Sequence, residues 1–165
     1  MDIKVGQQAI REATDKLKNW GRWGNDDQIG TLNHVRPEDI VRAAGLIRTG
    51  QMERCLSQGE WGGYAGGDAP GVKFENCYWC HEHQIAAIIT DTWGCEVRPN
   101  ETKDANQPWH WVVIPAMGLC MGEIFNLKEL AEDCAEDGVY EFFFCGAPLI
   151  ITGATGSPIN PQAIK

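Results

Sequence analysis

Apolar residues recur at intervals of three and four through the first twenty positions of the chain. This spacing places them on one face of a helix, so the sequence predicts an amphipathic first helix. Proline suits the first turn of a helix, and Pro37 therefore begins a second predicted helix that runs to about Ile47. The apolar positions of the first helix are Val5, Ala9, Ile10, Ala13, Leu17 and Trp20.

Three short apolar runs have the composition of β-strands: Gln84–Thr90, which we expect to be buried, Trp111–Ile114 and Val139–Cys145. Between the last two runs, the stretch from Asn126 to Gly138 predicts a helix with a capping residue at its start and a glycine at its end. The final fourteen residues are rich in turn formers and predict a tail without regular structure. The order of elements indicates a single mixed α and β domain over residues 1–165.

Two segments contain too much glycine to form regular elements. Asn19–Leu32 predicts an ordered loop rich in Gly, Trp and Asx residues. Gln58–Gly71 has six glycines in fourteen residues. It fits either a flexible surface loop or a loop whose backbone closes over a ligand, with Trp61 and Tyr64 as walls.

Charge and hydropathy exclude several classes of function. The chain has 165 residues, a formal charge of -9 and a pI near 4.8. Such an acidic surface repels phosphate backbones and anionic lipids, so we expect neither nucleic-acid nor membrane binding. No stretch approaches the roughly 18 apolar residues of a transmembrane helix, and the charged N-terminal segment lacks the apolar core of a secretory signal. These features predict a cytoplasmic protein whose seven cysteines are free thiols, mostly in the core.

The segment Cys77–His83 contains two patterns that are associated with bound groups. Cys77, Cys80 and His81 match the C-x-x-C-H pattern of covalent haem attachment. The same thiols have the spacing of a structural zinc site, to which His81 and His83 would contribute. There is no second C-x-x-C to complete such a site, and haem attachment normally follows export. Ordinary core cysteines are therefore the favoured interpretation.

The stretch Asn106–Glu123 joins a histidine to a carboxylate across an apolar run. His110 lies at the head of the run and Glu123 lies just past its end. Imidazole and carboxylate together suit a divalent metal, although two ligands are too few for a tight site. The alternative interpretations are a structural histidine between Trp109 and Trp111, and a solvated glutamate.

Other residues are weaker candidates. Asp91 directly follows a predicted buried strand, where it would be either a functional carboxylate or a cap. A nucleophilic cysteine, Cys95 or Cys120 paired with His110, is a formal alternative. Nothing in the sequence directs either thiol at the imidazole, so this alternative carries little weight.

Four stretches in order along the chain resemble the cyclase family of metal-dependent hydrolases, which includes kynurenine formamidase and isatin hydrolase. The combination of WGNDDQIGTLN, TDTWG and the segment from His110 to Glu123 is the most specific part. The stretches cover most of the chain. They are NWGRWGNDDQIGTLNHV, IAAIITDTWGCEV, PWHWVVIPAMGLCMGE and GVYEFFFCGAPLIITGATGSPINPQAI.

The resemblance implies an α/β fold of the cyclase or kynurenine-formamidase type, a swivelling β/β/α domain, here in incomplete form. It implies hydrolysis of C–N bonds in amides, formamides or lactams, as in the arylformamidase that converts a tryptophan breakdown product to kynurenine. Zinc or manganese would activate the attacking water. His110 matches a late histidine ligand of the metal and Glu123 matches the glutamate ligand that follows it.

The resemblance also implies a small aromatic amide or lactam substrate and a homo-oligomer, commonly a dimer. Trp61, Tyr64 and Trp93 are candidates to shape the substrate pocket, and plain core residues are the alternative. Asp91 and Trp93 match a strand-end stretch of the family. No catalytic acid or base is assigned.

The chain departs from the family at its metal motif. Family members have an earlier H-x-x-x-H-x-D motif that supplies most of the ligands, whereas none of the other three histidines here is set in such a motif. We hypothesise that residues 1–50 and 51–165 are joined at Ile47–Gly50 by an internal deletion. We therefore expect low stability, association and little hydrolysis by this chain alone. The alternatives are a non-catalytic fragment that associates with a full-length homologue and a small zinc- or haem-binding module at Cys77–His83.

Overall fold

The computed structural model describes residues 5–28, 30–34, 50–63 and 66–165. The described residues form two compact units, one from residues up to Lys128 and one from Glu129–Lys165. The predicted helix from Pro37 to about Ile47 lies outside the described residues, and the single-domain organisation stays a prediction. Among the described residues, no helix is long and apolar enough to cross a membrane.

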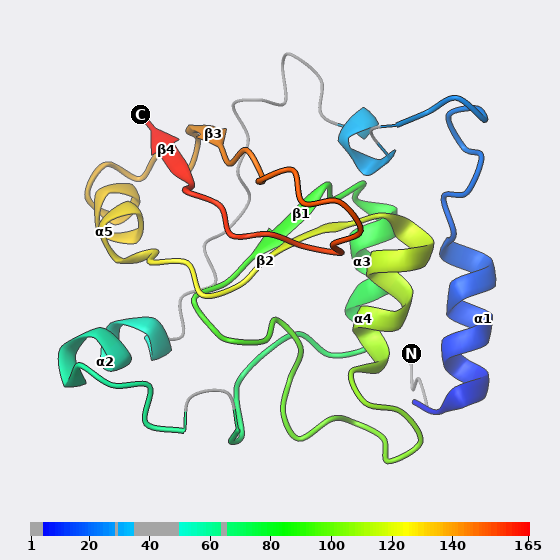
Figure 1. Ribbon diagram of the computed structural model, residues 1–165, viewed down its shortest axis with the longest axis horizontal. Helices are drawn as coiled ribbons and strands as arrows, with labels where there is room; N and C mark the ends of the chain where they lie inside the picture. The colour runs from blue at the N-terminus through cyan, green and yellow to red at the C-terminus, as the bar shows by residue number, and fades with distance from the viewer. Residues whose placement is uncertain (1–4, 29, 35–49, 64–65) are drawn as a thin grey trace. The chain divides into compact units, whose positions relative to one another are not determined.

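Three helices of the first unit pack side by side around its core (Figure 1). They are α1 (Gln7–Leu17), α3 (Asn76–Glu82) and α4 (Pro108–Val112). The predicted first helix is confirmed, because α1 buries Ala13 and Leu17 against the other two helices. The remaining buried members of the core are Phe74, Cys77, Cys80, Cys95, Trp109, Val112, Val113, Met117 and Leu119.

A pair of parallel strands crosses the first unit (Figure 1). Strand β1 (Ala87–Ile89) confirms the strand predicted within Gln84–Thr90, although it is only partly buried. It pairs with β2 (Cys120–Gly122) in the register Ala87 with Cys120 and Ile89 with Gly122. Because the two strands run in the same direction, the residues that follow them, Thr90–Glu96 and Glu123, emerge at the same edge of the sheet.

The predicted strand Trp111–Ile114 is wrong, because these residues are helical. Helix α4 ends at Val112 and continues as a π-helical turn, η2 (Val113–Met117). The β-branched and aromatic residues favour a strand locally, but two features fix the helix. Pro108 occupies its first turn, and the Glu96 carboxylate accepts the first backbone N–H groups.

Two further helices, neither of them predicted, occur in the loop-rich parts of this unit. They are the 3-10 helix η1 (Gly30–His34) and α2 (Gln51–Gln58). The end of the glycine-rich segment is ordered, since Val72 forms a bridge with Glu96. A Cβ on Gly71 would lie 2.5 Å from the carbonyl oxygen of Cys95. Only glycine fits at this position. Because Gly71 packs directly on the backbone of Cys95 and Glu96, it helps to fix the segment that carries Glu96.

The second unit contains most of α5 (Lys128–Asp137) and an antiparallel pair, β3 (Phe143–Cys145) and β4 (Gln162–Ile164). The predicted helix is confirmed and ends at Gly138, whose φ is +70°. The predicted strand Val139–Cys145 is present only in its last three residues. The prediction of a tail without regular structure is wrong over β4, because pairing with β3 is a long-range contact with no local signal.

Candidate functional site

An imidazole flanked by two carboxylates forms the candidate site in the first unit. His110 Nδ1 lies 2.8 Å from Glu96 Oε2. On the opposite side of the ring, His110 Nε2 lies 3.5 Å from Glu123 Oε1. The structure thus brings together His110 and Glu123, the two residues that the sequence predicts as metal ligands, and adds a second carboxylate, that of Glu96.

Glu96 is a buried carboxylate whose charge is compensated by several donors. Its side chain is 1% exposed. Besides the imidazole, it accepts the backbone N–H groups of Trp109 at 3.1 Å and His110 at 3.2 Å. A buried charge is tolerated only when hydrogen bonds replace its lost hydration. Glu96 therefore caps the first turn of α4 and fixes the His110 ring with the same carboxylate.

Glu123 is fixed by the loops at the carboxyl ends of the two parallel strands. Its Oε1 accepts the backbone N–H of Cys95 at 2.9 Å. The next residue, Ile124, has a φ of +63°, which is strained for a β-branched side chain. Its N–H donates to the carbonyl of Thr92 at 2.9 Å, a bond that helps to hold this turn. Carboxyl ends of parallel strands are common positions for ligand sites.

The two carboxylates determine the charge of the histidine. Burial by itself would lower the pKa of His110. Hydrogen bonds and the negative charges of Glu123 and Glu96 outweigh burial and raise this pKa to about 9. At neutral pH and without metal, the imidazole is a cation between two carboxylates, and a divalent cation can replace its Nε2 proton.

The donor atoms fit part of a metal coordination shell. Two ligands about 2.1 Å from a tetrahedral zinc lie roughly 3.4 Å apart, and the His110 Nε2 to Glu123 Oε1 distance is 3.5 Å. The bond from Nδ1 to Glu96 leaves Nε2 as the coordinating atom, the arrangement seen at many zinc sites. Within the described ranges, no cluster of three or more His, Cys, Asp or Glu side chains has metal-binding geometry. His110 and Glu123 stay the two predicted ligands.

The predicted substrate-binding residues lie in different surroundings. Asp91 is 2% exposed and accepts the backbone N–H of Gly50 at 2.7 Å, so it ties the start of α2 to the end of β1. Trp93 is half-buried beneath the guanidinium of Arg98, 4.8 Å from the ring centroid. Trp61 is 57% exposed in the loop after α2. Tyr64 lies outside the described residues, and the roles of all four residues stay predictions.

Neither candidate cysteine has the surroundings of a nucleophile. Cys95 is fully buried and its thiol lies 3.3 Å from the Thr90 hydroxyl. Burial raises the pKa of Cys95 to about 12 and also raises that of Cys120. A thiol rather than a thiolate is therefore present at neutral pH, which is the opposite of what nucleophilic catalysis needs.

The segment from Cys77 to His83 forms helix α3 and the residue after it. Both of its cysteines are fully buried in the core. Burial, first of all, raises the pKa of Cys77 to about 12 and that of Cys80 to about 11. Cys80 Sγ lies 3.0 Å from the side-chain oxygen of Asn76, and His83 Nδ1 lies 3.0 Å from the carbonyl of Trp79. These contacts support the core interpretation over a zinc or haem module.

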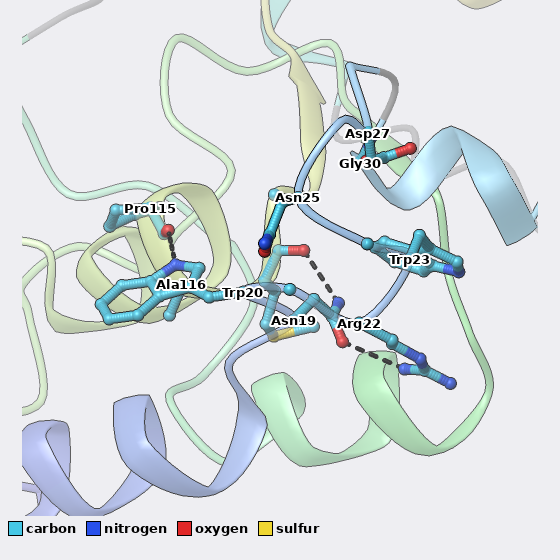
Figure 2. A pocket seen from close by; sticks show the side chains of 13 residues that line it. Asn19, Trp20, Arg22, Trp23, Asn25, Asp27, Gly30, Pro115 and Ala116 are labelled. Atoms are coloured by element: carbon cyan, nitrogen blue, oxygen red, sulfur yellow. Dashed lines mark hydrogen bonds between the residues drawn. The ribbon is translucent and has the colours of Figure 1, made fainter.

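A surface hollow of about 350 Å³ lies elsewhere in the first unit, between residues 19–30 and 115–118 (Figure 2). Neither His110 nor Glu123 lines it. Asn19 donates to the carbonyl of Met117 at 2.9 Å, and the Trp20 indole donates to the carbonyl of Pro115 at 2.8 Å. These bonds join two of the stretches on which the family resemblance rests.

Glu96 is the site residue that sequence reasoning missed. It lies fourteen positions before His110, just after TDTWG in a stretch of the family resemblance that assigns no role to it. A charged residue between Cys95 and Val97 is a weak signal for a buried position. The bridge from Val72 to Glu96 is a long-range contact, so only the folded backbone shows that this carboxylate faces the imidazole.

Comparison with known proteins supports the resemblance at the level of the fold. No family model and no curated protein matches the chain. A solved crystal structure described as a novel cyclase matches 73% of the chain with 36% sequence identity and a TM-score of 0.62. The chain has a cyclase-family fold. It spans 39% of the length of that cyclase.

Proposed function

We propose that the function of this chain is metal-dependent hydrolysis of C–N bonds in amides, formamides or lactams, as in arylformamidases. The observation that carries the proposal is the His110–Glu123 pair, whose facing donor atoms lie 3.5 Å apart. The cyclase-family fold supports it, and the sequence resemblance matches these two residues to metal ligands of the family. The proposed arrangement is the swivelling β/β/α domain, and the proposed metal is zinc or manganese.

Each residue of the site has a distinct part in this chemistry. His110 and Glu123 would hold the ion, and Glu96 would keep the imidazole in place. A bound divalent ion lowers the pKa of a water molecule and polarises a carbonyl oxygen. The partial exposure of Glu123, whose side chain is 31% exposed, leaves this edge of the site open to a substrate. The Trp93 ring belongs to the segment after β1, which also contains Cys95, whose N–H donates to Glu123, and it is the proposed contact for an aryl group.

The number of ligands limits the expected activity. Catalytic zinc sites generally have three protein ligands, and the described residues supply two. We therefore propose that the chain by itself hydrolyses slowly, and that a homo-oligomer or a full-length homologue supplies further ligands. The same observation favours a second candidate function, a non-catalytic fragment that associates with such a homologue.

Hydrolysis of an aryl formamide tests the proposal. Purified protein, with added zinc or manganese, is compared with Glu123→Gln and with Glu129→Gln, a matched control on α5. We expect slow release of formate by the wild type and the control, and at least a tenfold loss in Glu123→Gln, because an amide is a poor metal ligand. Equal rates in all three proteins would reject hydrolysis at this site. Absence of hydrolysis, together with a stable complex on mixing with a full-length homologue, would favour the second candidate.

A further inference from the structure

The Glu96 carboxylate contacts both the backbone and the side chain of the same histidine. Oε2 accepts the His110 N–H at 3.2 Å and lies 2.8 Å from His110 Nδ1. Oε1 accepts the N–H of Trp109 at 3.1 Å. A side chain held at three points cannot rotate away without losing the cap of α4. The orientation of the imidazole is thus coupled to the start of the helix that carries it.

The backbone that presents Glu96 is itself fixed from both sides. Val72 N–H donates to the Cys95 carbonyl at 2.8 Å, and Val97 N–H donates to the Val72 carbonyl at 3.1 Å. Gly71 packs directly on the same stretch, where no side chain would fit. A rigid support of this kind is what orientation of a metal ligand requires, because a displacement of about 1 Å is enough to weaken a site.

We propose that Glu96 is a positioning residue, which holds the His110 ring so that Nε2 faces Glu123 and serves as the metal-binding atom. The inference rests on the proposed metal site but concerns a residue that neither the resemblance nor the sequence motifs assign. Glu96 would not touch the metal, since its oxygens are used by Nδ1 and two backbone N–H groups. Its contribution is to fix which ring nitrogen carries a proton and which coordinates.

The first readout is the His110 Nδ1–H proton in metal-free, ¹⁵N-labelled protein. This proton is present in either charge state of the ring as long as Nδ1 donates to Glu96. We expect a slowly exchanging imidazole N–H signal in the wild type, and its loss in Glu96→Ala. The matched control is Glu101→Gln, because Glu101 also accepts a backbone N–H, that of Phe74, at another place in the unit. The control should retain the signal.

The second readout is zinc affinity, measured by competition with a chelating dye. Removal of an outer carboxylate partner typically weakens metal binding 10–100-fold, so we expect a loss of this size in Glu96→Ala. Because that variant also loses the cap of α4, Glu96→Gln provides a folded alternative. Its amide can accept from the backbone, but it presents an NH₂ group as well as an oxygen. We expect Glu96→Gln to melt close to the wild type and to bind zinc at least tenfold more weakly.

The two readouts separate the inference from the proposed function. If Glu96→Gln and Glu96→Ala both bind zinc as tightly as the wild type and keep the ring N–H protected, the positioning role is overturned and the metal site stands. Absence of zinc binding by the wild type would overturn the proposed function, and the N–H signal alone would then decide the positioning role. Protection in the wild type and Glu101→Gln with loss in Glu96→Ala supports that role, and equal protection in all three overturns it.

Discussion

Two regions of the first unit contain histidines beside possible metal ligands, yet their chemistry differs. At His110 the imidazole lies between the carboxylates of Glu96 and Glu123, and its pKa is raised to about 9. At the end of α3, the pKa of His81 is lowered by burial and then by the positive charges of Arg22 and Lys16. The surroundings of His110 favour a positive charge on its ring, whereas those of His81 disfavour one. The charge of the neighbours therefore says more about a metal site than sequence spacing does.

The same contrast applies to the other donor atoms of the two regions. Glu123 is partly exposed at a strand end, so its carboxylate is accessible from solvent. Cys77 and Cys80 are fully buried, and burial keeps both as neutral thiols. A C-x-x-C spacing within a helix places both side chains on the face that α3 turns to the core. The buried, neutral thiols thus agree with the sequence-based preference for ordinary core cysteines in this segment.

The largest expected effect on stability is a pH dependence, which distinguishes the His110 region from the α3 region. Because the pKa of His110 is raised from 6.5 to about 9 in the folded protein, its contribution is fully present below pH 6.5 and is lost as the pH rises through 9. We expect the free energy of unfolding of metal-free protein to fall by roughly 2 kcal/mol between pH 7 and pH 9. Urea denaturation across this range measures it.

Two variants serve as controls for the pH dependence. His110→Gln should abolish most of the fall, because the titrating group is removed. His81→Gln should run parallel to the wild type from pH 7 to pH 9, since a lowered pKa changes stability only below the unfolded value of 6.5. An equal slope in the wild type and His110→Gln would show that the two carboxylates do not hold a charged imidazole.

The next prediction disrupts the packing that holds Glu96 next to His110. Gly71→Ala places a methyl group 2.5 Å from the Cys95 carbonyl oxygen, so the backbone that carries Glu96 must shift. We expect a loss of about 1–3 kcal/mol of unfolding free energy, as for other overpacked sites. Gly67→Ala is the matched control, because no atom lies within 4 Å of its added methyl group. Equal urea midpoints for the two variants would contradict the close packing at Gly71.

Local pattern was enough to predict the elements whose determinants are short-range. Helix α1 follows from the spacing of Ala13 and Leu17, and α5 follows from its glycine end at Gly138. Strand β1 follows from an apolar run. The stretch Trp111–Ile114 predicts a strand but is helical, because the helix start is capped by Glu96, which comes from another segment. Strand β4 was missed for the related reason that its partner β3 is distant in the sequence.

The site residues also divide into two that have a local sequence signal and one that has none. His110 and Glu123 were predicted from a histidine and a glutamate at the ends of one apolar run, and the structure brings them within 3.5 Å. That proximity needs the parallel pairing of β1 with β2 and the turn at Ile124, neither of which has a sequence signature. Glu96 was not predicted at all, since its role depends on a bridge to Val72.

The last prediction concerns the reactivity of the thiols in α3 and not the stability of the protein. At pH 8, alkylation by iodoacetamide proceeds through the thiolate, which is scarce when burial raises the pKa of Cys77 to about 12 and of Cys80 to about 11. We expect Cys80 to react roughly a hundredfold more slowly than the exposed Cys145, and Cys77 roughly a thousandfold more slowly. Peptide mass spectrometry measures the rates. Rapid labelling of Cys77 or Cys80 would argue that the thiols are accessible, as a metal module needs.

Zinc and manganese content per protomer, measured by elemental analysis, tests the central claim most directly. The comparison is between wild type, His110→Ala and His83→Ala, which remove one histidine from each of the two regions. Our account predicts metal in the wild type and in His83→Ala, and its loss in His110→Ala. Metal that survives His110→Ala but disappears with His83→Ala would contradict the account and place the metal at the end of α3.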